Sequence, residues 1–450
     1  MDKAFLTIDN ALTGLASGDL TPSTLAESCL RQIERLNPKL NAFITVQPSE
    51  VENQYSDGPL FGIPLAVKDL YETAGIRTTA GSKFFKDYIP SQDAFVIEKL
   101  KQVGAIILGK TNTHEIALGV TTNNPHFGAC LNPWDTTRTP GGSSGGSAVA
   151  VATGMALGAM GTDTGGSIRI PASLCGIVGL KPTYGRVSLR GVFPLSWNLD
   201  HAGPLTRTVK DAAIILQVIA QYDSQDPACM NMLTGDYLGH MLDGIKGRKI
   251  AFAVGEYVED CDPEVFQALQ EARRVFEELG ATIHEVEMSF LRDAALANGL
   301  MTTADGAAYH RERLAEHPDW FGIDVRQRLE MGAAYTSSEY SLARRKQAEV
   351  QRRCELLFES YNLLLLPTTP IPAPTFDGRD AVEEAKRLTR FTAPFNLTGL
   401  PAISLPCGFT KQGLPIGLQL VTRHWAEARI LMAAHAYEQA TEWHKRVPKL

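Results

Sequence analysis

Apolar residues recur at helical or strand spacing along the first 110 residues, and they predict a helix followed by two buried strands. Thr21-Pro22 is a typical helix start, and apolar positions follow it at helical spacing, which predicts an amphipathic helix over residues 20–40. The apolar run 63–67 predicts a buried strand that ends on Lys68. A second run, 103–108, predicts another buried strand.

Residues 144–159 are almost all Gly, Ala, Ser, Val, Met or Leu. The pattern shows no polar face at any period. We therefore expect a helix over 144–159 that is buried on every side.

The second half of the chain alternates strand and helix patterns. Residues 222–247 are more polar and loop-like and mark a soft boundary, after which 249–254, 263–279 and 281–286 predict a β-α-β unit. A capping box at Thr336 begins a helix that runs to about Tyr361. A strand at 362–367, a proline-rich loop at 367–374 and strands at 401–406 and 416–421 complete the pattern. This alternation predicts an α/β fold with a largely buried sheet.

Composition and charge narrow the class of protein. The 450 residues are 44% hydrophobic and 21% charged, and the net charge of −7 provides no basic field for nucleic acid or anionic lipid. The start, MDKAFLTIDNALTG, lacks the apolar core of a signal peptide, and we find no membrane-spanning run. Seven cysteines without a CxxC pair indicate neither a disulfide framework nor a metal site. We expect a cytoplasmic protein without a metal or other cofactor.

The stretch GTDTGGSIRIP, residues 161–171, permits three interpretations. Asp163-Thr164-Gly165 matches the aspartic-protease triplet, but that chemistry needs two such carboxylates and the chain has one such triplet. A phosphate-binding loop would need a lysine after the glycines, and none follows. The third interpretation makes Ser167 a nucleophile below a row of backbone N–H groups.

A rival nucleophile is Ser143, because GGSSG at 141–145 fits the Gly-x-Ser-x-Gly elbow of α/β-hydrolases. That scheme requires a downstream acid and histidine. Histidines follow the motif, but none lies in a glycine-rich or turn-rich setting that indicates a pocket. The pentapeptide alone is a weak signal.

The combination of motifs is far more specific. A lysine ends a strand at Lys68, PGGSSGGSA follows at 140–148, and GTDTGGSIRIPASLCGIVGLKPT occupies 161–183. With GLPAISLPCGF and GLPIGLQLV near the C-terminus, the chain closely resembles the amidase signature family of serine hydrolases. The resemblance implies one domain over 1–450, with a large mostly parallel or mixed central sheet flanked by helices in an α/β/α arrangement.

The resemblance also implies catalytic roles. Ser167 looks like the nucleophile, Ser143 the bridging serine, reached through a cis Gly142–Ser143 peptide, and Lys68 the base. A lysine acts as a base near neutral pH only if its pKa is lowered, and burial at a strand end has that effect. A serine hydroxyl donates and accepts, so Ser143 can pass a proton from Ser167 to Lys68.

The remaining motif residues are assigned to support. The backbone N–H groups of Thr164, Gly165, Gly166 and Ser167 match the family's oxyanion hole, in which donors are aimed at the developing charge. We expect Asp163 to accept hydrogen bonds that hold this loop, and Arg169 to be a buried ion-pair partner, with Asp163 as the candidate acid. We expect Ser144 to bond Lys68 or the loop.

Substrate specificity is less defined by the sequence. The family pocket implicates Ala117, Leu118 and Gly119, with Trp197 as a weaker candidate, and their apolar character favours a small uncharged amide cleaved through an acyl-enzyme. The alternatives are a carbamate or urea, and glutamine in the glutaminase subunit of a tRNA-dependent amidotransferase. That subunit carries an acid before Phe-Thr-x-Pro, where this chain has Thr389-Arg390.

For partners, we expect a small-molecule amide or carbamate and a second copy of the chain, with no nucleic acid and no membrane. A scaffold subunit without activity is the non-enzymatic alternative.

Overall fold

The computed structural model of the chain describes residues 3–47, 58–376 and 380–450. These residues form an 11-stranded mixed sheet in the order β1-β3-β2-β6-β8-β7-β12-β13-β11-β9-β10, and a separate pair of short strands, β4 (Asn123–Asn124) and β5 (Gly128–Ala129). The strands of the large sheet are β1 (Phe43–Val46), β2 (Pro64–Lys68), β3 (Ile106–Thr111), β6 (Gly158–Asp163), β7 (Val178–Lys181), β8 (His201–Thr206), β9 (Lys249–Val254), β10 (Thr282–Glu287), β11 (Leu363–Pro367), β12 (Ala402–Phe409) and β13 (Pro415–Val421).

The sheet contains two parallel groups of strands joined by an antiparallel middle. β3, β2 and β6 pair in parallel, as do β11, β9 and β10, while β1 adds an antiparallel edge to β3. The pairings from β6 through β8, β7, β12 and β13 to β11 are antiparallel. Because β7 pairs with β12, the strands before and after residues 222–247 belong to one continuous sheet. The assignment of 1–450 to a single domain stays a prediction.

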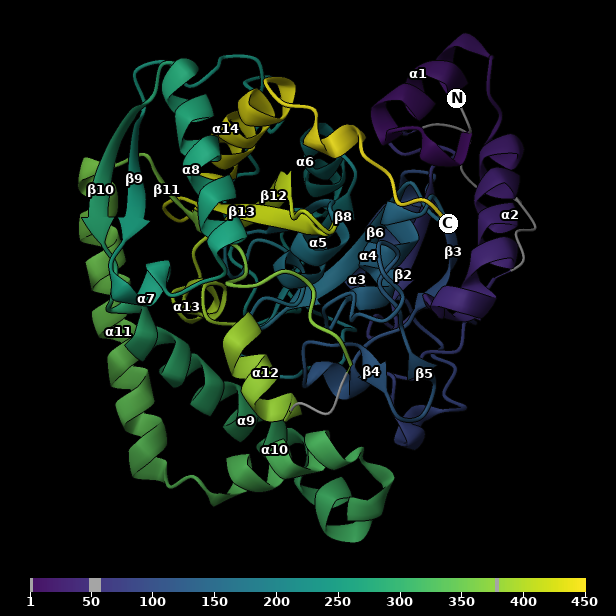
Figure 1. Cartoon of the computed structure of the whole chain (residues 1–450). Helices are drawn as coiled ribbons and strands as arrows, with labels where there is room; N and C mark the ends of the chain where they lie inside the picture. The colour runs from purple at the N-terminus through teal and green to yellow at the C-terminus, as the bar shows by residue number, and fades with distance from the viewer. Residues whose placement is uncertain (1–2, 48–57, 377–379) are drawn as a thin grey trace.

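Helices cover both faces, as an α/β/α arrangement requires (Figure 1). The first face packs in the largest apolar cluster, with helices α1 (Ile8–Ser17), α2 (Pro22–Leu40), α3 (Phe95–Gln102), α6 (Val209–Ile219), α8 (Pro263–Glu278) and α14 (Glu427–Gln439). The other face carries α7 (Glu256–Glu259), α9 (Leu291–Glu316), α10 (Ile323–Ala334), α11 (Ser337–Ser360), α12 (Ala381–Leu388) and α13 (Ala393–Leu397). Along β11, Leu363 and Leu365 pack in the first cluster and Leu364 and Leu366 in the second, as strand alternation requires.

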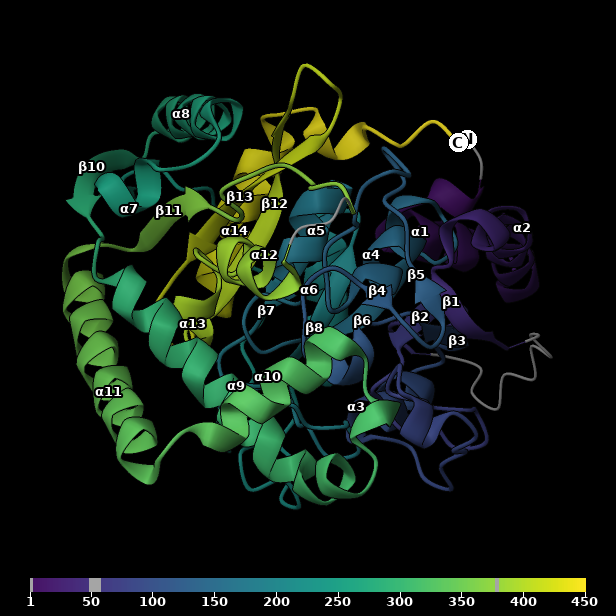
Figure 2. The ribbon, with the colours of Figure 1, turned by 60° about the horizontal axis from the view of Figure 1, so that its bottom comes forward.

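Figure 2 shows α9, α10 and α11 side by side as a helical layer on this second face. Contacts between α9 and both neighbours agree with that view. This layer and α12 supply much of the wall of the cavity described below.

Most of the predicted elements are present at close to the expected bounds. The predicted helix over 144–159 is wrong in its second half, because α4 (Gly145–Ala152) ends early and β6 begins at Gly158. The chain turns at Gly154, whose φ is +73°. A side chain there would also meet the backbone of Ala4, at 2.7 Å from its carbonyl oxygen. Both α4 and β6 are fully buried, so neither has the polar face that would distinguish helix from strand.

Candidate active site

Three elements bring Lys68, Ser143 and Ser167 to the same region. Lys68 is the last residue of β2, Ser143 lies in the loop before α4, and Ser167 lies between β6 and α5 (Arg169–Cys175). β2 and β6 are neighbours in parallel, so their carboxyl ends meet at one edge of the sheet. Lys68 and Ser143 are fully buried and Ser167 is 4% exposed.

The Lys68 ammonium group has two hydroxyl partners. Nζ donates to Ser143 Oγ at 2.7 Å and to Thr162 Oγ1 at 2.7 Å. Burial lowers the pKa of Lys68 from 10.5 to about 7, although Asp163 and Asp200 both favour the charged form. A substantial fraction of this amine is therefore neutral near pH 7.

The serines at 143 and 144 are held by the backbone around them. The Gly142–Ser143 peptide is cis, and the Ser143 carbonyl accepts hydrogen bonds from Thr113 Oγ1 at 2.9 Å and from His114 N at 3.2 Å. Ser144 Oγ donates to the Thr162 carbonyl at 3.2 Å, and Ser144 N donates to the Ser167 carbonyl at 3.2 Å. Ser144 thus ties the loop to β6, while Thr162 provides the second hydroxyl bonded to Lys68.

Asp163 and Arg169 form a buried ion pair. Arg169 Nη2 lies 2.8 Å from Asp163 Oδ1 and Nε lies 3.0 Å from Oδ2. Burial alone would raise the pKa of Asp163, but the Arg169 guanidinium holds it well below its ordinary value. Asn396 donates to Asp163, and Gln419 accepts from Arg169, so both charges are satisfied. The pair fixes the ends of the loop that carries Ser167.

The loop 164–167 presents backbone donors. Within the described residues, the N–H groups of Gly165, Gly166 and Ser167 donate no hydrogen bond. Gly166 has φ +135°, and a Cβ there would lie 2.2 Å from Thr392 Oγ1, so the turn requires glycine. Thr392 Oγ1 in turn donates to the Gly165 carbonyl at 2.6 Å. Such fixed, unpaired donors suit an anionic oxygen.

A cavity of about 980 Å³ opens onto this loop. Thr164, Gly165 and Ser167 line it, together with Ala117, Leu118 and Gly119 from the candidate pocket segment. Trp197 is not among its lining residues; its side chain is 48% exposed, and its carbonyl accepts a hydrogen bond from Tyr184. Ala117 has φ +61°, a left-handed conformation unusual for alanine.

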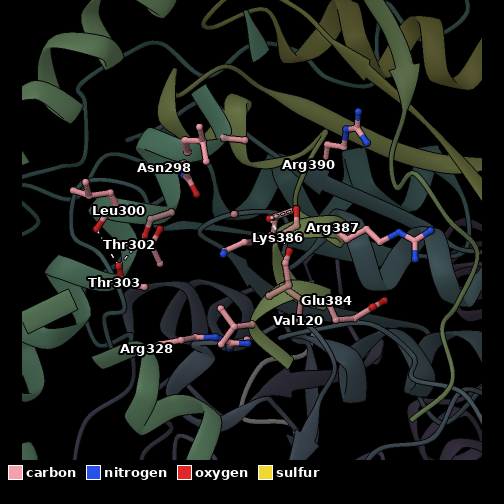
Figure 3. Close-up of a pocket in the computed structure, with 18 of the residues that line it drawn as sticks. Val120, Asn298, Leu300, Thr302, Thr303, Arg328, Glu384, Lys386, Arg387 and Arg390 are labelled. Atoms are coloured by element: carbon pink, nitrogen blue, oxygen red, sulfur yellow. Dashed lines mark hydrogen bonds between the residues drawn. The ribbon is translucent and has the colours of Figure 1, made fainter. Parts of the chain in front are cut away.

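The cavity walls carry charges of both signs (Figure 3). Arg328 enters from α10, where it donates to the carbonyls of Leu118 and Ala381. The charged lining residues are Arg292, Arg328, Lys386, Arg387, Arg390, Asp260, Asp380, Glu383 and Glu384. These charges do not match the apolar character expected from residues 117–119.

Three residues near the loop escaped the sequence analysis. Thr162 bonds Lys68, Asp200 accepts from Thr164 Oγ1 at 2.5 Å, and Asn298 donates from Nδ2 to the Thr164 carbonyl at 3.1 Å. Thr162 could have been found, because it lies at alternate spacing from Met160 along the strand before the motif. Asp200 and Asn298 lie far along the chain and have no motif of their own.

The described residues hold no group of three or more His, Cys, Asp or Glu side chains placed to bind a metal ion. None of the helices in the described part of the chain combines the length and apolar character that crossing a bilayer requires.

Comparisons with known proteins agree with this geometry. The family model described as Amidase matches residues 24–431. A glutamyl-tRNA(Gln) amidotransferase subunit of Carboxydothermus hydrogenoformans is 39% identical, over all of both chains. The structure of the glutamyl-tRNA(Gln) amidotransferase subunit of the same name from Thermotoga maritima has a TM-score of 0.87 and 35% identity, covering 98% of this chain and 95% of its own. A 6-aminohexanoate cyclic dimer hydrolase has a TM-score of 0.92 and 28% identity, covering 100% and 99%.

These comparisons correct one expectation. A small-molecule substrate with no nucleic acid and no partner beyond a second copy is contradicted, because relatives that match almost the whole chain are named as subunits of a tRNA-dependent amidotransferase. Net charge misled here, since a total of −7 says nothing about local surfaces. The family match over most of the chain, the full-length relatives and the mixed sheet flanked by helices lead to one conclusion: the chain belongs to the amidase signature family of enzymes acting on carbon–nitrogen bonds.

Proposed function

We propose that the protein hydrolyses a carboxamide through an acyl-enzyme on Ser167. Ser167 Oγ attacks the amide carbon while its proton passes to Ser143 Oγ and the Ser143 proton passes to neutral Lys68. The C–N bond then breaks, and the protonated Lys68 returns a proton through Ser143 to the leaving nitrogen. Water attacks the ester by the same relay and frees Ser167. The 2.7 Å hydrogen bond between Lys68 Nζ and Ser143 Oγ, at the floor of the cavity that Ser167 lines, carries this proposal.

The protonation state of Lys68 suits the relay. A neutral amine has two N–H donors and one lone pair. It can donate to Thr162 and accept the Ser143 proton, which the charged form cannot do. The pKa near 7 makes this form available at neutral pH.

The loop 164–167 completes the chemistry in this proposal. The backbone N–H groups of Gly165, Gly166 and Ser167 would stabilise the oxyanion, each contributing about 3 kcal/mol to the barrier reduction. Asn298 Oδ1 accepts no hydrogen bond from the described residues, and a Cβ on Gly165 would lie 3.3 Å from it. We assign this oxygen to the N–H of the substrate amide.

For the substrate, we propose glutamine, with the chain acting as the glutaminase subunit of a tRNA-dependent amidotransferase. The full-length relatives support this, and so does a wall that holds both guanidinium and carboxylate groups, as a zwitterionic amino acid requires. The partners are then the remaining subunits and tRNA. We place this activity in the cytoplasm, where the seven cysteines, all free in the structure, would stay reduced.

A small uncharged amide or a carbamate is the second candidate. Thr389 lines the cavity. It stands where the resemblance places an acid in glutaminase subunits. Without that acid, the α-ammonium group of glutamine lacks one partner.

The test is turnover by the purified chain, alone and with the amidotransferase partner subunits co-expressed. We expect glutamate release from glutamine that increases with the partners, and none from the Ser167→Ala variant. Hydrolysis of anilides, primary amides or carbamates without glutamine turnover in either preparation would favour the second candidate. Ser167→Ala with wild-type turnover would overturn the mechanism itself.

A further inference from the structure

Asp200 is a buried carboxylate beside the active site to which the proposed mechanism gives no role. It directly precedes β8 and is 7% exposed. Its Oδ1 accepts the Thr164 hydroxyl at 2.5 Å. Its Oδ2 accepts the backbone N–H groups of Leu195 at 2.8 Å and Ser196 at 3.0 Å.

These contacts fix two walls of the cavity relative to each other. Thr164 belongs to the loop with the unpaired N–H donors, and Leu195 lines the same cavity. Asn298 holds the Thr164 carbonyl at 3.1 Å, so Thr164 is restrained on its side chain by Asp200 and on its backbone by α9. Loss of the Asp200 contact would release the side-chain restraint while leaving the backbone restraint.

Charge distinguishes Asp200 from Asp163, the other carboxylate that acts on Lys68. Asp163 is paired with Arg169 at 2.8 Å. Across the described residues, Asp200 has no Lys, Arg or His within ion-pair distance. Its charge is therefore balanced by hydrogen bonds alone, and Lys68 is the cation that its field favours.

The other titratable groups around Asp200 carry no charge that could replace it. Burial and the field of Asp200 keep Tyr71 and Tyr184 protonated, raising the pKa of Tyr184 to about 12. Burial lowers the pKa of His201, the next residue, well below its ordinary value, so His201 stays neutral. Asp305 lies beyond Ser196, whose hydroxyl donates to it at 2.5 Å.

We propose that Asp200 is a positioning residue for amide hydrolysis: its ionised carboxylate holds Thr164 of the oxyanion loop and stabilises the charged form of Lys68. This rests on the proposed roles of Lys68 and of loop 164–167. Burial raises the pKa of Asp200 to about 6, so the group is mainly ionised at the pH where Lys68 titrates.

The two effects predict separate consequences for the Asp200→Asn variant. Removing the negative charge makes the Lys68 ammonium less stable, so the rise of kcat/KM with pH should move to lower pH by about one unit. Weakening the Thr164 contact should lower the plateau kcat by about tenfold, because the N–H donors are less well placed. A purely structural role would lower activity without moving the pH profile.

Two variants separate the effects. Thr164→Val removes the hydroxyl but keeps the Asp200 charge, so kcat should fall about tenfold while the profile stays in place. Thr164→Ser should restore most of the rate. Asp211→Asn is the matched control: Asp211 is also fully buried and accepts the N–H of Asp9 at 3.1 Å, but it acts on Arg207 and not on Lys68.

The experiment is the pH dependence of kcat and kcat/KM for the purified wild type and these variants. An unmoved or upward-moved profile in Asp200→Asn would overturn the electrostatic role. Wild-type kcat in Thr164→Val would overturn the positioning role, and this variant tests it even if Asp200→Asn does not fold. Activity in Lys68→Met would instead show that the proposed relay fails, because the profile would then not belong to Lys68.

Discussion

Replacing Lys68 by methionine should stabilise the protein below pH 7 and destabilise it near pH 10. Lys68 is fully buried, and its pKa falls from 10.5 to about 7. A shift of that size corresponds to about 4 to 5 kcal/mol of destabilisation whenever the folded chain must hold the charged form. Methionine has a similar unbranched shape and no charge, so it removes this cost.

The hydrogen bonds of Lys68 oppose that gain. The variant loses the 2.7 Å contacts to Ser143 and Thr162 and leaves both buried hydroxyls with one partner fewer. Each loss costs about 1 to 1.5 kcal/mol. The net expectation at pH 6 is a gain of about 2 kcal/mol in the free energy of unfolding.

The sign of the effect changes with pH. The unfolded chain keeps the Lys68 proton up to about pH 10, whereas the folded chain loses it near pH 7. The unfolded state therefore binds more protons in this window, and wild-type stability rises with pH across it and is flat below it. The variant lacks this rise. Near pH 10 only the lost hydrogen bonds remain, so the variant should be the less stable protein.

Urea unfolding of both proteins at pH 6, 8 and 10 in matched buffers measures this difference. Lys110 and Lys181 also have lowered pKa values, but both proteins contain them, so their contribution cancels. A difference that is constant with pH, or a variant less stable than wild type at pH 6, would refute the reasoning that Lys68 is held at a lowered pKa by burial.

Other consequences can be tested on single variants. Lys68→Arg should be inactive from pH 5 to 10, because a guanidinium keeps its proton, whereas wild-type kcat/KM should rise through about pH 7 and stay high; near-full activity of the variant would leave Lys68 only as a positive charge. Ser143→Ala should lower kcat by about 10²-fold or more in a glutamate-release assay, and a loss below fivefold would exclude Ser143 from the relay. Arg169→Met should cost about 3 to 5 kcal/mol in urea unfolding because it leaves Asp163 buried and unpaired, and adding Asp163→Asn should recover part of it; no loss in the single variant would contradict the ion pair's importance. If glutamine is the substrate, Thr389→Asp should lower its KM while leaving anilide hydrolysis unchanged; an unchanged KM would argue against an ammonium site at residue 389.

The centre of the site could be predicted from the sequence because its residues lie in long, distinctive motifs. The strand ending at Lys68 has a simple apolar pattern, and 140–148 and 161–183 combine glycine runs with fixed polar positions. Arg169 stood out as a charge between two isoleucines, and its partner is Asp163, six residues earlier. Local sequence determined these contacts, so local sequence could reveal them.

The boundary between α4 and β6 could not be predicted in the same way. Helix and strand are told apart by the period of their polar positions. Residues 144–159 are buried on every side, so no period exists to read. Gly154 was the available signal, and a single glycine within a helical pattern is a weak one.

The cavity walls were missed for a different reason. Arg328, Asn298 and the charged residues of α12 lie on amphipathic helices, where a polar residue normally indicates a face towards solvent. Only the tertiary packing of α9, α10 and α12 over loop 164–167 turns these positions inwards. The apolar segment 117–119 was visible in the sequence, so the substrate appeared less charged than the full wall indicates.

The central claim is that Ser167 is the nucleophile, served by Ser143 and Lys68. Mass-spectrometric mapping of a fluorophosphonate adduct on the full chain tests it most directly. We predict one adduct, on Ser167, absent in Ser167→Ala and formed much more slowly in Lys68→Met. An adduct on Ser143 or Ser144 would contradict the claim and place the nucleophile in the GGSSG segment instead.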